Sequence, residues 1–358
     1  MIKYIGSKRL LIPALGQIAS VAYDTGARTA LDLFSGTTRV AQEFKRQGFE
    51  VTACDIASYS EVLAQCYIAT DAARVDLVEL ETILQELAAL PGKRGYFTKV
   101  FCEDSHYFQP KNGMRVDAIR DAIEAQYKDH PYYPILLTSL MLAADRVDST
   151  AGIQMAYLKE YAQRSYNDLE LRVPQLVLGK GHAKRGDAAQ LAQQLGRFDI
   201  AYLDPPYNQH RYYTNYHIWE TLIRWDSPEH YGKACKRIDA RDENTKSPFN
   251  KKGHMADSLR QVIKEVNADT LVVSYNNESW VCAQQIEEWL HEKGYPAVQT
   301  FNFDFKRYIG AQIGIYNKEG KKVGKVDHLK NIEHIFVAGS KELVSGVEEH
   351  IEGAIHHD

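Results

Sequence analysis

The residues best suited to chemistry are Asp204, Pro205, Pro206 and Tyr207, which follow the apolar run 198–203. The two prolines cannot donate hydrogen bonds to a sheet, so we expect a strand to end here, with Asp204 at its carboxyl end. Ligands of open α/β sheets bind beyond that edge. A simple strand-ending turn is the alternative interpretation of the four residues.

The tetrapeptide suits an attack by a planar exocyclic amine on an electrophilic methyl group. Such a nitrogen is a poor nucleophile because its lone pair is delocalised into the ring. The carboxylate of Asp204 and the carbonyl of Pro205 are placed to accept its two N–H bonds. Tyr207 would stack on the ring, a contact of about 1–3 kcal/mol that requires the base to leave its duplex.

A second pattern, residues 29–55, predicts a βαβ unit. Residues 29–41 read as strand, glycine turn and helix, and residues 48–55 read as a strand ending in Asp55. In such units an acid after the second strand binds ribose hydroxyls, although capping of the next helix explains Asp55 equally well. Only Gly36 stands where a dinucleotide-binding turn has three glycines. The pattern therefore favours a cofactor without phosphates, such as S-adenosylmethionine.

Two further short segments could contribute to a binding site. Gly6, Ser7 and Lys8 precede a short apolar helix pattern, where backbone N–H groups and an ammonium suit an anionic group; a surface turn is the alternative. Asp187, about a dozen residues before the central strand, is placed to accept a hydrogen bond from an adenine amino group.

Composition limits the class of protein. The 358 residues carry 43 Lys and Arg against 47 Asp and Glu, a net charge of −4, so any contact with nucleic acid must use local patches. The five cysteines are scattered without Cys-x-x-Cys pairs, which indicates neither a zinc site nor a disulfide framework and favours the cytoplasm. No metal site is expected. The sequence shows neither a signal-peptide pattern nor an apolar run of membrane-spanning length.

The chain is expected to form an α/β catalytic domain with a largely helical insertion. Helical spacing recurs in residues 77–87, 116–127 and 135–147, and it predicts an inserted domain with its own small core. The last third returns to strands, with 298–308 and 334–338 as a terminal hairpin. The predicted division is 1–74, cofactor-binding part; 75–185, helical insertion; 186–225, tetrapeptide part; 226–260, basic mobile loop; 261–340, C-terminal strands; 341–358, tail.

Polar, aromatic and basic residues after the tetrapeptide suggest contacts with nucleic acid. Residues 208–217 concentrate rings and hydrogen-bonding groups, and residues 233–252 carry a local excess of basic side chains. A solvated charged surface is the alternative for the basic stretch. The candidates are Asn208, His210, Arg211, Tyr212, Lys236, Arg237, Lys251 and Lys252.

Taken in order, the motifs resemble the alpha-class (D12-type) adenine-specific DNA methyltransferases, over roughly residues 2–338. The motifs that carry the resemblance are Tyr4-Ile-Gly-Ser-Lys8, Asp32-Leu-Phe-Ser-Gly36, Asp55, Gly186-Asp187, Asp204-Pro-Pro-Tyr207 and Ser274-Tyr-Asn276. In this class the cofactor motif precedes a target-recognition insertion, which precedes the catalytic tetrapeptide. One departure is Thr38, where the family has a second glycine, so the local turn geometry is open.

The resemblance implies a Rossmann-like S-adenosylmethionine-dependent sheet with helices on both faces and an inserted, mainly helical target-recognition domain. It implies methylation of the N6 amine of a flipped adenine in double-stranded DNA, in a restriction-modification system with a cognate endonuclease or in an orphan or phage methylase. Catalysis is assigned to Asp204, Pro205, Pro206 and Tyr207. The implied cofactor-binding residues are Tyr4, Gly6, Lys8, Asp32, Phe34, Ser35, Gly36, Thr37, Asp55, Ile56 and Asp187.

Two other functions fit the same motifs. Some methylases of ribosomal RNA use this tetrapeptide on a base amine. A catalytically silent DNA-binding subunit could keep the fold, although the intact residues 204–207 disfavour it.

Overall fold

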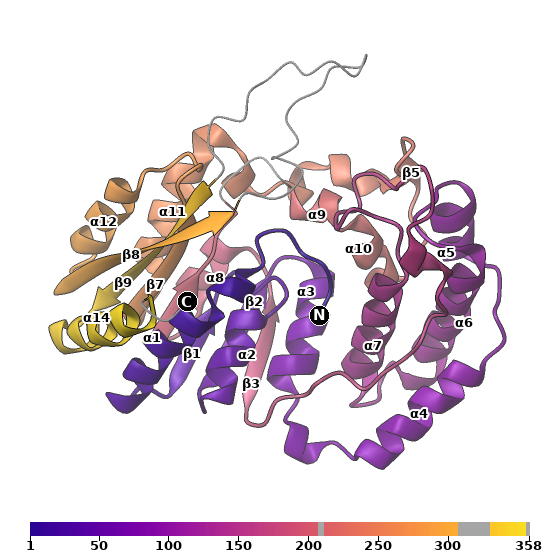
Figure 1. Cartoon of the computed structure of the whole chain (residues 1–358), viewed down its shortest axis with the longest axis horizontal. Coiled ribbons are helices and arrows are strands. Elements are labelled where there is room, and N and C mark those ends of the chain that lie inside the picture. Colours follow the sequence, from indigo (N-terminus) through magenta and orange to yellow (C-terminus); the bar gives the residue numbers. More distant parts are fainter. Residues whose placement is uncertain (207–210, 307–329, 356–358) are drawn as a thin grey trace.

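A central seven-stranded sheet organises the computed structural model, which describes residues 1–206, 211–306 and 330–355 (Figure 1). The strand order is β3-β2-β1-β4-β7-β9-β8. The first five of these strands are parallel, and β9 runs antiparallel to both its neighbours. The bounds are β1 Thr29–Asp32, β2 Glu50–Asp55, β3 Gly181–Arg185, β4 Phe198–Leu203, β7 Ala268–Asn276, β8 Ala297–Lys306 and β9 Lys330–Gly339.

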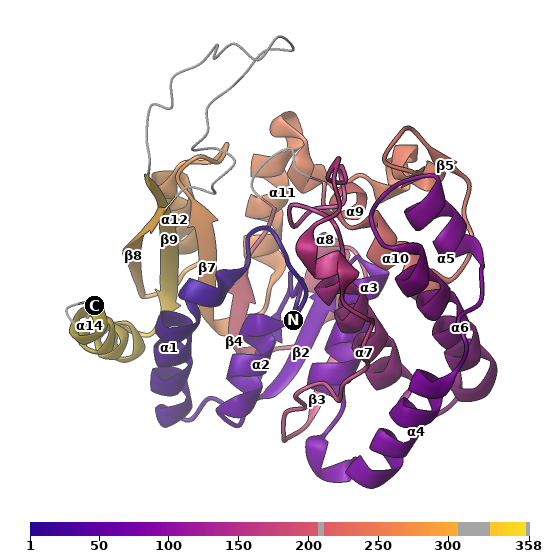
Figure 2. The same ribbon diagram turned by 45° about the vertical axis from the view of Figure 1, so that its right-hand side comes forward.

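Helices cover both faces of this sheet, as predicted. Successive residues of β4 point to opposite faces, so Ile200 and Tyr202 join one apolar cluster while Ala201 and Leu203 join another. Because both faces are buried, the last four residues of β4, Ile200 to Leu203, form a continuous apolar run. Figures 1 and 2 show the two layers. The helices are α1 Ile12–Asp24, α2 Arg39–Arg46, α3 Ser58–Ala64 and α14 Lys341–Ile355 on the first face, and α8 Ala188–Gln194, α11 Lys252–Glu265 and α12 Ala283–Glu292 on the second.

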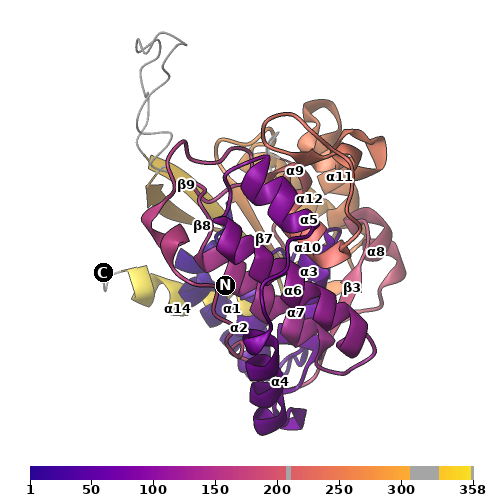
Figure 3. The same ribbon diagram turned by 90° about the vertical axis from the view of Figure 1, so that its right-hand side faces the viewer.

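The helical segment gathers beyond the β3 side of the molecule, and Figure 3 views it from that side. Its predicted helices are present, but the expected separate core is not. Leu80, Val116 and Ile135 belong to the same apolar cluster as α1 and α2, because α7 packs against α3. The helices are α4 Leu77–Ala89, α5 Tyr96–Thr98, α6 Pro110–Tyr127 and α7 Tyr133–Arg146, with α9 Tyr212–Asn215 and α10 His217–Arg224 from later in the chain.

The edge strand β3 corrects the predicted boundary at residues 185 and 186. Gly181–Arg185 pairs in parallel with β2, so this segment belongs to the sheet and not to the insertion. Its residues are mostly exposed and lack apolar alternation, which explains why the sequence did not indicate a strand. The predicted terminal hairpin is confirmed as β8 and β9, and its turn lies outside the described residues.

The basic stretch 226–260 is built of short ordered elements where a loop was predicted. These are β5 His230–Tyr231, β6 Lys236–Arg237, η6 Ile238–Arg241, η7 Glu243–Thr245 and η8 Pro248–Asn250, followed by α11. The tail also forms an element: Val347 and Ile351 of α14 are buried, and the helix packs on α1. Across 1–206, 211–306 and 330–355, no helix is long and apolar enough to cross a membrane.

Candidate active site

A cavity of about 250 Å³ opens at the carboxyl ends of β1, β2 and β4. Asp204 and Pro206 line it together with Gly36 and Asp55, so the tetrapeptide and the glycine turn face one space. All eleven residues predicted to hold a cofactor line the cavity: Tyr4, Gly6, Lys8, Asp32, Phe34, Ser35, Gly36, Thr37, Asp55, Ile56 and Asp187. Tyr207, Asn208 and His210 lie outside the described residues, and Pro205 is described but does not line the cavity.

Asp204 is held by an ion pair at the floor of the cavity. Its Oδ1 lies 3.1 Å from the Nζ of Lys8, and its side chain is 20% exposed. Burial raises the pKa of Asp204 to about 6; the charge of Lys8 lowers it and that of Glu333 raises it. The Asp204 carboxyl group is therefore ionised at neutral pH, and its carboxylate is an unusually basic hydrogen-bond acceptor.

Asp32 places a second carboxyl group below the cavity. It is 1% exposed, and its Oδ2 accepts a hydrogen bond from the backbone N–H of Ala41 at 3.2 Å. Within the described part of the chain its Oδ1 has no hydrogen-bond partner, and neither has Oγ of Ser35. Burial and the nearby charge of Asp204 raise the pKa of Asp32. Two buried polar atoms in the lining thus remain available to a ligand.

Stacked tyrosines position the amino-terminal segment over the cavity. The ring of Tyr4 stacks on those of Tyr212 and Tyr216, with centroids 5.1 and 4.6 Å away, and these two rings also stack on each other at 6.3 Å. The hydroxyl of Tyr216 also accepts a hydrogen bond from the N–H of Ile5 at 2.7 Å. Tyr212, predicted to contact nucleic acid, therefore supports Tyr4 and lines the cavity. Tyr216 was not singled out by sequence because its partner lies at the far end of the chain.

The turn after β1 is tied to the end of β2 through Asp55. Its Oδ2 accepts a hydrogen bond from Gly36 N–H at 2.9 Å, and its Oδ1 accepts one from Ala57 N–H at 3.0 Å. The N-cap of α3 is Ala57, with no side-chain cap hydrogen bond, so Asp55 ties the two turns together, does not cap that helix, and lines the cavity. Gly36 has φ of +48°, and a Cβ there would lie 3.2 Å from Tyr4, which explains the need for glycine.

Thr38 resolves the turn geometry that the sequence left open. It has φ of +63°, in the left-handed region that glycine adopts freely and β-branched residues rarely enter. Its side chain is fully buried, and its Oγ1 accepts a hydrogen bond from Nε2 of Gln42 at 2.9 Å. The threonine therefore adopts a backbone conformation that glycine would enter without strain.

Asp187 caps the helix that borders the cavity on the β3 side. Its Oδ1 accepts hydrogen bonds from the N–H groups of Ala189 and Gln190 at 3.0 and 3.3 Å. The backbone N–H of Gly186 donates to the carbonyl of Asp55 at 3.0 Å, which joins this turn to β2. Asp187 and Asp55 consequently stand at the ends of the neighbouring strands β3 and β2, a proximity that the sequence did not predict because it did not indicate β3.

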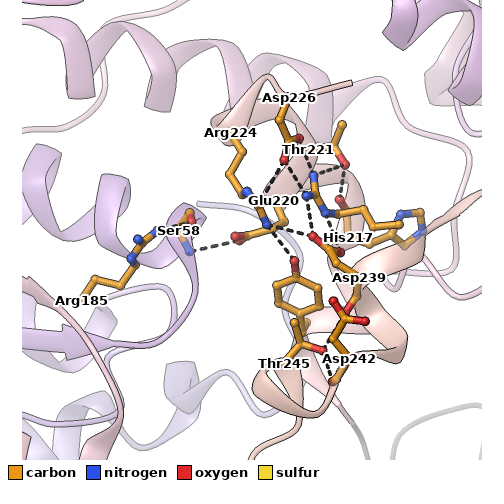
Figure 4. Close-up of polar contacts among 12 residues, drawn as sticks. Ser58, Arg185, His217, Glu220, Thr221, Arg224, Asp226, Asp239, Asp242 and Thr245 are labelled. Atoms are coloured by element: carbon orange, nitrogen blue, oxygen red, sulfur yellow. Dashed lines mark hydrogen bonds and ion pairs between the residues drawn. The ribbon is translucent and has the colours of Figure 1, made fainter. Parts of the chain in front are cut away.

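Arg237 does not face solvent, which corrects its assignment as a DNA contact. It is 1% exposed, and its guanidinium forms bidentate bonds with Asp226, both at 2.7 Å, and bonds with Asp239 at 2.8 and 3.1 Å. Figure 4 labels the two aspartates together with Arg224, which also pairs with both of them. Arg237 fastens β6 to the end of α10 and is not available for a phosphate.

The other basic candidates differ in their surroundings. Arg211 lines the cavity and donates to the carbonyl of Ala240 at 2.8 Å. Lys251 pairs with Glu243 at 3.2 Å, whereas Lys252 is exposed at the start of α11. Lys236 is partly buried on β6.

Several lining residues were missed by sequence reasoning. Arg39 begins α2, Arg224 ends α10, and Phe249 packs edge-on against Phe34 with ring centroids 5.2 Å apart. Of these residues, only Arg39 could have been inferred from the sequence, because it is a basic residue close after the glycine turn. Segment 245–250 reaches the cavity through tertiary packing that no local pattern reports.

Comparisons with known proteins agree with this geometry. The profile of the D12 class N6 adenine-specific DNA methyltransferases matches residues 4–280. The chain is 32% identical over 346 residues to the type II methyltransferase M.NlaIII of Neisseria lactamica, covering 93% of this chain and 99% of that protein. It is 28% identical to M.CviAII of Paramecium bursaria Chlorella virus 1, covering 87% and 94%.

A further relative is longer. The chain is 31% identical to the modification methylase StsI of Streptococcus sanguinis, covering 81% of this chain but 46% of that protein. The motif order, the shared cavity and the match over most of the chain lead to one conclusion. The chain belongs to the D12 class of N6 adenine-specific DNA methyltransferases.

Proposed function

We propose that this protein transfers the methyl group of S-adenosylmethionine to the N6 amine of an adenine flipped out of a short double-stranded DNA site. The observation that carries the proposal is the single cavity shared by Asp204, Gly36 and Asp55. An acceptor for an amine and a turn suited to a nucleoside cofactor thereby face each other.

The residues present fit this cofactor. An ammonium on its amino-acid part suits Oδ1 of buried Asp32, which has no hydrogen-bond partner among the residues that the structure describes. The ribose and adenine suit acids at the ends of β2 and β3, where Asp55 and Asp187 stand. Ile56, 53% exposed although apolar, offers a flat contact for a ring. When bound, the cofactor supplies a methyl group activated by a positively charged sulfur.

Asp204 orients and activates the incoming amine. Its carboxylate accepts one N–H of the adenine, and the backbone carbonyl of Pro205 accepts the other, which favours a pyramidal nitrogen with a localised lone pair. As the new N–C bond forms, the nitrogen becomes cationic and loses a proton, which Asp204 is placed to accept. We assign Tyr207 to stacking on the flipped base.

We further propose a role in restriction-modification. The relatives named above are type II methyltransferases and a modification methylase, which supports methylation of a defined DNA sequence and a cognate endonuclease that the methylation blocks.

The direct test uses purified protein, labelled S-adenosylmethionine and mixed-sequence duplex DNA. Digestion of the product to nucleosides should yield labelled N6-methyladenine. Label on cytosine, or transfer to ribosomal RNA with none to DNA, would refute the proposal. The variant Asp204→Asn serves as the inactive control.

A further inference from the structure

The carboxylate of Glu333 meets the active site from β9, beyond residues 4–280 that match the family profile. Its Oε2 lies 3.2 Å from the Nζ of Lys8, the same ammonium that lies 3.1 Å from Asp204. Glu333 is 8% exposed and Lys8 is 7% exposed, so water screens these charges little.

The Ser274-Tyr-Asn276 motif accounts for the position of Glu333. Asn276 ends β7 and lies opposite Glu333 in the antiparallel pair with β9. Its Nδ2 donates to Oε1 of Glu333 at 3.1 Å, so both carboxylate oxygens have partners. Asn276 is 3% exposed, and the adjacent Asn277 bonds twice to Ile332, which fixes the strand register.

We propose that Glu333 is a positioning residue for methyl transfer: anchored by Asn276, it shares the ammonium of Lys8 so that Asp204 remains a strong acceptor for the target amine. This inference rests on the proposed function, because it gives Asp204 the acceptor role. Without Glu333, Lys8 would pair more fully with Asp204, and the carboxylate would be a weaker acceptor.

The charged groups around Asp204 give the direction of the effect. Lys8 lowers the pKa of Asp204 and Glu333 raises it. Asp32 lies close enough for Asp204 to raise its pKa in turn, and buried Tyr202 also lines the cavity. Removing the charge of Glu333 therefore lowers the pKa of Asp204. The acid limb of the pH–rate profile, where kcat falls as Asp204 becomes protonated, then moves to lower pH.

The test compares Glu333→Gln with the unaltered protein on duplex DNA. We expect kcat to fall about tenfold, the KM for DNA to stay constant, and the acid limb to move down by about one pH unit. Glu287→Gln replaces a carboxylate on α12 that accepts a hydrogen bond from Thr300 of β8, and it should change none of these quantities. An unmoved acid limb together with an unchanged kcat for Glu333→Gln would overturn the inference.

Two additions keep the result decisive. If Glu333→Gln does not fold, Glu333→Asp keeps the charge and should retain the acid limb of the unaltered protein with a lower kcat; a moved limb would then overturn the inference. Binding of S-adenosylhomocysteine, measured by calorimetry, should be unchanged in the folded variants, and a loss comparable to the loss of kcat would indicate a merely structural role. Full activity of Asp204→Asn would refute the proposed function itself, a separate failure.

Discussion

Gly36 donates its backbone N–H to the carboxylate of Asp55 at 2.9 Å, so the chain's own contacts hold the turn after β1 against the end of β2. Both residues line the cavity. A turn fixed in this way costs less to order when a cofactor arrives.

Substituting Gly36 should weaken cofactor binding. In Gly36→Ala the new Cβ would lie 3.2 Å from the Tyr4 ring, and the residue would be strained at φ of +48°. We expect the affinity for S-adenosylhomocysteine, measured by calorimetry, to fall about tenfold or more. Gly253→Ala, on α11 with nothing within 4 Å of the added carbon, is the matched control and should bind normally. Equal affinities for the two variants would contradict this assignment.

Replacing Asp204 should separate activity from stability. Asp204→Asn removes the charged acceptor, and we expect the rate of methyl transfer to fall about a hundredfold or more. Because burial raises the pKa of Asp204, its ionised form is disfavoured by folding, and the neutral amide should leave the Tm at pH 8 unchanged or higher. Nucleoside analysis and thermal melts measure the two quantities. A Tm several degrees lower would show that the pair with Lys8 stabilises the fold.

Activity should depend on pH through the same group. With a pKa of about 6, Asp204 is ionised above pH 6 and protonated below it. The ionised form is the acceptor, so we expect kcat to be constant above this value and to fall about tenfold per pH unit below it. Circular dichroism at each pH shows whether the protein remains folded. A rate that is flat down to pH 4.5 would exclude an ionised Asp204 from the rate-limiting step.

Replacing Arg237 should lower the free energy of unfolding. Arg237→Ala removes the buried cation that pairs with Asp226 and Asp239 and leaves them the more exposed Arg224. Removing one member of a buried ion cluster costs about 3 kcal/mol. Denaturant unfolding measures this free energy. Lys233→Ala, at an exposed position in the same stretch, should change it by less than about 0.5 kcal/mol. If Arg237→Ala had normal stability but bound DNA more weakly, the result would instead support the DNA contact that the sequence predicted for Arg237.

The sequence predicted the elements and residues whose contacts are local in the chain. The βαβ unit, the strand before Asp204 and the cavity residues from Asp32 to Ile56 follow from motifs at the ends of β1, β2 and β4, and parallel strands bring those ends together. Charge alone misled the prediction for Arg237, because two aspartates fold back onto it. β3 lacks an apolar pattern since it is an exposed edge strand. Phe249 reaches the cavity, and Glu333 reaches Lys8 in its lining, only through tertiary packing.

The position of β9 between β7 and β8 has a consequence for synthesis of the protein. Every motif through Asn276 leaves the ribosome before the strand that carries Glu333. The sheet lacks an inner strand until then, and the charge around Lys8 is incomplete. An incompletely synthesised chain should therefore not methylate DNA. Activity should begin only after β9 has been inserted between β7 and β8.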